Sequence, residues 1–249
     1  MKSFKRAVVT LSIAPALTAA SALHLAAQES DWQLDLGASV QFTTITGDIG
    51  FAGVDNARTL SLGDLVSSAQ PGFAIEFDVW KGDWGVLTDM FTVEYEGKAA
   101  TDQNAVFTTQ AEESVGRVAV GRRVASGAHV YAGARFWSTA LDFRLTEPNP
   151  GTLDGSDSWV DPVIGGSIDT PIQDGWFAVL DADLGGFGVG SNFTWHAMGS
   201  LGYEVSPGWS VLVRYRATGV DYETDTADGG TVTYDTIRHG AFFGLVLHF

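Results

Sequence analysis

Acidic and basic side chains recur at alternate positions within otherwise apolar segments of this chain. A single apolar residue separates Asp181 from Asp183, and another separates Arg214 from Arg216. In an extended strand, residues two apart share one face, with Cα atoms roughly 6.5–7 Å apart. Eight charged residues are predicted to share the inner face of one sheet: Glu76, Asp78, Arg135, Asp161, Asp181, Asp183, Arg214 and Arg216.

Several kinds of chemistry suit these residue types. Paired carboxylates can act as general acid and base in glycoside or protease chemistry. Opposite charges on neighbouring strands, such as Arg135 and Asp161, can form an ion pair, which would suit either a filled lumen or a polar path for small solutes. Ser191, His196 and Asp183 could also approach one another, since a catalytic triad is recognised by geometry rather than by order along the chain. A histidine that fills a polar interior is the simpler interpretation, so no catalytic residue is assigned.

The sequence gives little support to cofactor or metal chemistry. The chain has no cysteine, which excludes disulfides, thiolate metal sites and cysteine nucleophiles. The glycine-rich segment 186–190 lacks the spacing and the following helix of a nucleotide loop, and a tight turn explains it. Scattered loop acids bind Ca²⁺ or Mg²⁺ weakly, so we interpret them as solvated. These acids are Asp154, Asp157, Glu223, Asp225 and Asp228.

Strands of alternating apolar and polar residues must hold these charges. From Trp32 to Phe42 every second residue is apolar, and the residues between are mostly polar. Soluble strands average about five or six residues, whereas a tilted membrane strand needs about 9–11, so this length favours a membrane strand. The same alternation continues in segments 71–80, 128–137, 159–168, 176–184, 193–203, 211–216 and 232–249. Segments 84–96 and 106–123 are also predicted strands, but their patterns do not decide which residues face inward.

The connections between these strands alternate between short and long. The short connections are 81–83, 124–127, 171–175 and 206–208, and the longer ones are 46–70, 97–104, 146–158, 185–191 and 223–230. Bacterial outer-membrane barrels have short periplasmic turns, long outer loops and an even strand number. The sequence therefore predicts an all-β fold, an antiparallel up-and-down transmembrane β-barrel of about ten strands, with eight or twelve as alternatives. A short helix from Leu62 to Ser68 is predicted either to pack on the rim or to plug the lumen.

Aromatic residues near the strand ends are predicted to form girdles at the two membrane interfaces. The periplasmic girdle comprises Trp32, Trp84, Trp176 and Trp209, and the outer girdle comprises Phe187, Phe193 and Tyr222.

The beginning of the chain has the pattern of a cleaved signal peptide, residues 1–27. Lys2, Lys5 and Arg6 precede an Ala-rich stretch that ends in small residues. The remainder, 28–249, is predicted to be one domain. Its net charge falls from −16 to −19, because the removed part carries three bases and no acid. A chain with this much negative charge repels the phosphates of nucleic acid, which argues against binding to DNA or RNA.

Several segments resemble small proteobacterial outer-membrane β-barrel proteins of the OmpA/OmpW-like and porin-like groups. The matching segments are 62–65, 80–85, 133–137, 159–165 and 183–191, together with the alternating final strand that ends on Phe249. Ser167 and Arg214 depart from the pattern. The resemblance implies a place in the outer membrane of a Gram-negative bacterium, and it implies that the assembly machinery reads Phe249.

Three functions remain open from these observations. The first is a porin-like or structural barrel with at most a narrow polar path, in which the eight charges either set selectivity for small solutes or fill the lumen. The second is an outer-membrane enzyme acting on lipid or peptide, although no enzyme is expected. The third is an adhesion or interaction barrel that uses its acidic loops. Expected partners are outer-membrane lipid, lipopolysaccharide, the barrel assembly machinery and small solutes.

Overall fold

The computed structural model describes residues 31–52, 57–61, 70–100, 106–147, 151–225 and 231–249, which form one antiparallel sheet. Its strands are β1 (Trp32–Ala52), β2 (Ala57–Ser61), β3 (Gln70–Lys81), β4 (Trp84–Ala100), β5 (Val106–Ala125), β6 (Ala128–Glu147), β7 (Gly151–Pro171), β8 (Trp176–Gly185), β9 (Phe193–Ser206), β10 (Trp209–Asp225) and β11 (Thr231–His248). Within these residues β2 pairs only with the far end of β1, so ten strands form the wall. The predicted ten-strand barrel is confirmed. The signal peptide, 1–27, and the helix from Leu62 to Ser68 lie outside the described residues.

Pairing between the first and last strands closes the sheet. β1 and β11 are in register from Asp35 opposite His248 to Ala52 opposite Thr231. Two backbone bonds extend this seam, because Leu34 donates to Phe249 at 3.0 Å and Phe249 donates to Leu34 at 2.9 Å. Lipid offers no hydrogen bonds, so closure is what allows a sheet to cross a bilayer. The role of Phe249 as an assembly signal stays a prediction.

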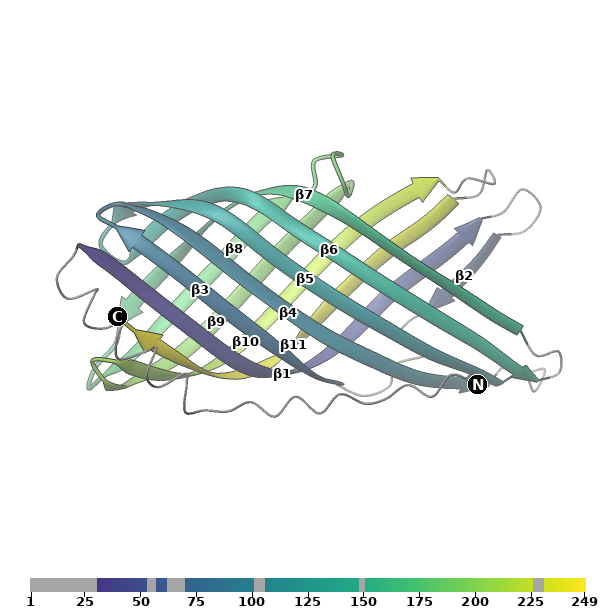
Figure 1. Ribbon diagram of the computed structural model, residues 1–249, viewed down its shortest axis with the longest axis horizontal. Coiled ribbons are helices and arrows are strands. Elements are labelled where there is room, and N and C mark those ends of the chain that lie inside the picture. Colours follow the sequence, from purple (N-terminus) through teal and green to yellow (C-terminus); the bar gives the residue numbers. More distant parts are fainter. Residues whose placement is uncertain (1–30, 53–56, 62–69, 101–105, 148–150, 226–230) are drawn as a thin grey trace.

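The two ends of the barrel differ. All four predicted short turns are present, between β3 and β4, β5 and β6, β7 and β8, and β9 and β10, and Phe249 lies at this same turn end, at the left of Figure 1. At the opposite, extended end the strands continue further than predicted. Segment 46–70 was expected to be loop, yet β1 runs to Ala52 and pairs with β2; segment 146–158 was likewise expected to be loop, yet β7 begins at Gly151. Beyond the lipid both faces of a strand meet water, so the alternation that marks a strand in the sequence disappears.

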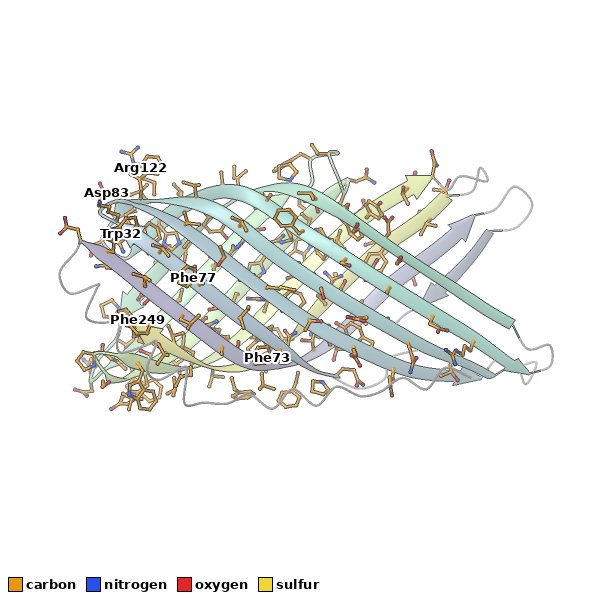
Figure 2. All side chains as sticks on the ribbon, in the orientation of Figure 1. Trp32, Phe73, Phe77, Asp83, Arg122 and Phe249 are labelled. Atoms are coloured by element: carbon orange, nitrogen blue, oxygen red, sulfur yellow. The ribbon has the colours of Figure 1, made fainter. Side chains whose placement is uncertain are left out.

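Apolar side chains cover the outside of the wall. Figure 2 shows Phe73 and Phe77 along β3 and Trp32 near the turn end. The exposed residues include Leu36, Val40, Phe73, Phe77, Val118, Ile164, Leu180, Val213 and Phe243. A soluble protein rarely exposes so large an apolar surface, whereas the lipid-facing band of a membrane barrel requires one. No helix among the described residues is long and apolar enough to span a membrane.

The aromatic girdles are only partly as predicted. Trp32, Trp84 and Trp176 are exposed near the turn end, and Phe193 is exposed near the other end of the short β9 strand. The prediction for Tyr222 was wrong, because this residue is buried inside the barrel, where its ring stacks on Trp159. Tyr222 is an even number of residues from Leu212 and Arg214 on β10, so its side chain points inward as theirs do.

The lipid-facing band can be tested on β8. Leu180 is 64% exposed at the middle of this strand. Replacing Leu180 by Arg should lower the free energy of unfolding in lipid vesicles by about 2–4 kcal/mol, because a charge near the midplane must be desolvated. Denaturant titration followed by tryptophan fluorescence measures this loss. Val189→Arg is the matched control, because Val189 is 74% exposed but lies in the hairpin beyond β8. Equal losses in both variants would contradict a lipid-facing β8.

Candidate functional site

All eight charged residues that the sequence placed on one face lie on the inner side of the wall. Six are buried in the lumen: Arg135, Asp161, Asp181, Asp183, Arg214 and Arg216. Glu76 and Asp78 are half-buried and line an internal cavity. The strand pattern thus brings them together as expected, and a role in solute selection stays a prediction.

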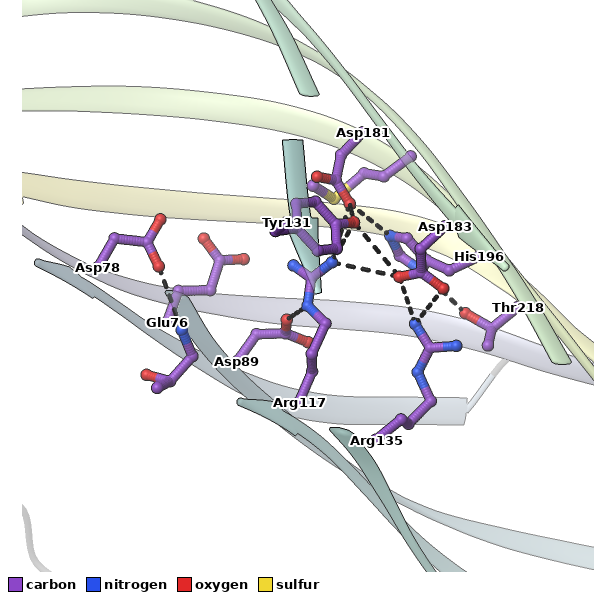
Figure 3. Close-up of polar contacts among 12 residues, drawn as sticks. Glu76, Asp78, Asp89, Arg117, Tyr131, Arg135, Asp181, Asp183, His196 and Thr218 are labelled. Atoms are coloured by element: carbon purple, nitrogen blue, oxygen red, sulfur yellow. Dashed lines mark hydrogen bonds and ion pairs between the residues drawn. The ribbon is translucent and has the colours of Figure 1, made fainter. Parts of the chain in front are cut away.

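An ion-pair network centred on Arg117 crosses the middle of the lumen (Figure 3). Arg117, on β5, donates from Nε to Asp89 on β4 at 2.8 Å. Its Nη1 donates to Asp181 and Asp183 on β8, both at 3.2 Å. β5 and β8 are three strands apart in the ring, so these bonds span the interior rather than neighbouring strands. A buried charge needs such partners because desolvation is costly.

Three further side chains complete this network. Arg135 donates from Nη2 to both oxygens of Asp183, at 2.6 and 2.8 Å. Tyr131 donates to Asp181 at 3.0 Å. The Nε2 atom of His196 lies 3.4 Å from Asp181, and its other ring nitrogen is 3.2 Å from Thr218. Each carboxylate on β8 therefore contacts at least two partners, which fixes the positions of all these side chains.

Arg135 and Asp161 were expected to pair, and this prediction was wrong. They are direct register neighbours on β6 and β7, but Arg135 bonds to Asp183 instead. Asp161 accepts bonds from Trp137 at 2.7 Å and from the backbone and hydroxyl of Ser191 at 2.6 and 2.5 Å. These neutral donors satisfy Asp161, because the β8–β9 hairpin folds back over it.

The hairpin between β8 and β9 turns through residues with positive φ. Gly186 and Gly188 have φ of 83° and 73°. Glycine tolerates these angles at no steric cost, so the sequence interpretation of a tight turn is correct. The turn places Ser191 against Asp161 and leaves β8 only ten residues long.

A second cross-lumen contact lies nearer the extended end. Arg238 on β11 is 2.5 Å from Glu113 on β5, and each side chain is 2% exposed. Tyr234 donates to the same carboxylate at 3.0 Å. Arg238 also lies over the ring of Trp137 at 4.7 Å. β11 and β6 are five strands apart in a ring of ten, so this cation–π contact joins opposite walls.

Stacked aromatic rings fill the space beside this ion pair. The rings of Trp159 and Tyr222 are 3.9 Å apart and nearly parallel, and Trp137 stacks on the other side of Trp159 at 5.6 Å. Tyr222 also donates to Asp157 at 2.8 Å, so β10 and β7 meet above the short β8–β9 hairpin. Twelve buried apolar side chains pack into this core: Ile45, Ala74, Phe91, Val93, Tyr95, Val115, Trp137, Trp159, Val220, Tyr222, Tyr234 and Phe242.

The sequence did not identify Asp89, Glu113, Arg117 or Arg238 as lumen residues. Arg117 and Glu113 lie on the long, weakly patterned strand β5, and Asp89 lies on β4, whose facing was undecided. Register could have found them, because Asp89 is directly opposite Arg117 in the β4–β5 hairpin. The turn between β3 and β4 determines which residues of β4 point into the lumen, and from this the pairing of Asp89 with Arg117 could have been predicted.

The residues of the possible triad are engaged elsewhere. Ser191 is fully buried and bonds to Asp161, and His196 contacts Asp181 and Thr218. Asp183 accepts from Arg117 and Arg135. Ser191, His196 and Asp183 therefore bond to other partners rather than to one another. Within the described residues, no three His, Asp or Glu side chains are placed to hold a metal ion.

Comparison with known proteins relates this chain to others through its fold. No protein-family model and no curated protein sequence matches it. The outer membrane protease OmpT from Escherichia coli is similar with a TM-score of 0.53 and 10% identity, over 87% of this chain and 97% of that one. The attachment invasion locus protein Ail of Yersinia pestis gives a TM-score of 0.39 and 9% identity, over 87% and 99%. The chain thus has the fold of a bacterial outer-membrane β-barrel.

The buried pair of Glu113 and Arg238 yields a double-mutant test. Glu113→Gln or Arg238→Met alone should each cost about 3–5 kcal/mol of unfolding free energy, because the other charge stays buried without its partner. The double variant should cost clearly less than the sum of the two single losses. Equilibrium unfolding in vesicles measures all three. Strictly additive losses would show that the two side chains do not interact.

Proposed function

We propose that this chain is a closed structural barrel of the outer membrane whose lumen does not conduct solutes. The observation that carries this proposal is the contact of Arg238 with Trp137 and Glu113, which joins opposite walls within a fully buried aromatic core. In this proposal the eight predicted lumen charges hold the lumen together rather than select solutes. Membership of the OmpA/OmpW-like group is part of the same proposal.

Conduction would require a continuous wet path through this core. The stacked rings of Trp159 and Tyr222, with 3.9 Å between centroids, leave no space for water between them. A solute ion entering an apolar layer would lose its hydration without gaining equivalent partners. The Arg117 network, packed between Asp89 and Asp181, adds a second obstacle in the middle of the lumen.

A role in surface interactions is the second candidate, and strand length favours it. β6 and β7 have 20 and 21 residues, about twice the 9–11 that a bilayer requires. The excess builds sheet beyond the lipid, where lipopolysaccharide or another partner could be contacted. An enzyme acting on lipid or peptide finds no support in Ser191 and His196, which are buried. Likeness to a protease at 10% identity concerns the fold alone.

Planar-bilayer recording tests the closed lumen. The purified chain should give no channel events, because the aromatic core interrupts the path. Replacing Trp159, Tyr222 and Arg117 together by Ala should produce conductance, since this removes both the aromatic stack and the centre of the ion-pair network that obstruct the lumen. Tyr215→Ala is the matched control, because Tyr215 also lies on β10 but faces outward and is 55% exposed. Steady conductance of the unaltered chain would reject the proposal.

A further inference from the structure

The lumen next to the turn end contains a polar cavity of about 420 Å³. Gly127, Asp169 and His248 line its mouth near the short turns, and Arg117 and Arg216 line its inner end. The ion-pair network around Arg117 forms that inner end, and the aromatic core lies beyond it. A cavity of this volume falls within the range of small-molecule sites, roughly 300–1,000 Å³.

Arg216 at the inner end is buried, yet it donates no hydrogen bond to an oxygen within the described part of the chain. It is 5% exposed, and its one hydrogen bond among the described residues is a long one of 3.9 Å to the sulfur of Met198. Its nearest carboxylates, Glu76 and Asp89, are both 3.9 Å away, beyond hydrogen-bonding distance. A guanidinium group carries five N–H donors, and leaving them unused when buried is costly. The guanidinium group lies over the rings of Phe242 and Phe91 at 4.8 and 5.4 Å, which holds it at the cavity wall.

Two neighbours of Arg216 also have polar atoms without a hydrogen-bond partner among the described residues. Arg214 lies two residues away on the same strand and bonds to Glu76 through Nη1, and its Nε atom has no hydrogen-bond partner among the described residues. Ser200 lies directly opposite Arg214 on β9, and its hydroxyl also lacks a partner. All three side chains line the cavity. Their donors favour a negatively charged group at the inner end.

Acidic residues lie closer to the mouth. Asp78 accepts one bond, at 3.3 Å from the backbone of Thr88, and no arginine, lysine or histidine of the described chain forms an ion pair with it. Figure 3 shows its carboxylate lying apart from the Arg117 network. Asp169 is exposed at the rim. Within the described residues, the cavity therefore has a guanidinium group without a hydrogen bond to oxygen at its inner end, and carboxylates without an ion pair toward its mouth.

We propose that this cavity binds a small zwitterion that carries both a carboxylate and an ammonium group, a free amino acid or a dipeptide. Its carboxylate would accept from Arg216, with Arg214 and Ser200 beside it, and its ammonium group would pair with Asp78. Charge-assisted bonds of this kind are the strong ones in protein interiors. This site goes beyond the proposed function, because binding from the turn end and conduction across the lumen are separate measurements.

Calorimetric titration of the purified full chain in detergent tests the charge requirement. The probes are alanine, dialanine, N-acetyl-dialanine, which lacks the ammonium group, and dialanine amide, which lacks the carboxylate. Alanine or dialanine should bind, and comparing the two decides which length the cavity fits. Each blocked compound should bind about 10- to 100-fold more weakly than dialanine if dialanine is the better ligand.

Two variants connect this loss to individual residues. Arg216→Met should weaken dialanine binding about 10- to 100-fold but leave the residual binding of dialanine amide unchanged. Asp78→Asn should weaken dialanine and spare N-acetyl-dialanine. Arg122→Met is the matched control, because Arg122 is also near the turn end but faces outward over the ring of Trp84. It should bind as the unaltered chain does.

Several results would overturn the proposal. No heat with alanine or dialanine at millimolar concentration would do so, as would equal affinity for the blocked and unblocked compounds. Unchanged binding in a folded Arg216→Met variant would also contradict it. Heat-dependent gel mobility reports folding, and the blocked probes on the unaltered chain decide the outcome if that variant does not fold.

Discussion

A sheet that crosses lipid must close, because lipid cannot bond to a free strand edge. The ladder between β1 and β11, extended by the two bonds between Leu34 and Phe249, meets this constraint. Closure fixes every second side chain inside, so a narrow lumen must hold all the residues that lipid excludes. The ion pairs that cross the lumen and the aromatic core inside the barrel both follow from this crowding of inward-facing side chains.

The lumen accommodates its charges by pairing them across the interior. Arg117 joins β5 to β4 and β8, and Arg238 joins β11 to β5, so distant parts of the wall are connected at two levels. Such pairs offset the desolvation of the charges and resist deformation of the wall, although an apolar core of equal volume could be as stable. Toward the turn end the pairing is incomplete. Arg216 and Asp78 are left with unused capacity, and a cavity lies between the walls.

The fold could be predicted because lipid enforces a simple rule on sequence. The alternation from Trp32 to Phe42 and the short turn at 81–83 gave strand facing and connectivity directly. Partner choice could not be read in this way. Asp161 lies opposite Arg135 yet bonds to Ser191 and Trp137, because the bend of a hairpin decides its environment. Arg117 was not predicted to face the lumen because both faces of β5 carry polar and apolar residues. Only its pairing with Asp89 on β4 places it there.

The central claim is that the lumen is closed beyond the turn-end cavity. The chain has no cysteine, so Val179→Cys introduces a single thiol on the cavity wall. In vesicles with the barrel inserted in one orientation, a membrane-impermeant maleimide should modify this thiol when added on the turn-end side. It should not do so when added on the extended side. Modification at similar rates from both sides would show that a continuous path crosses the barrel, which would contradict the account.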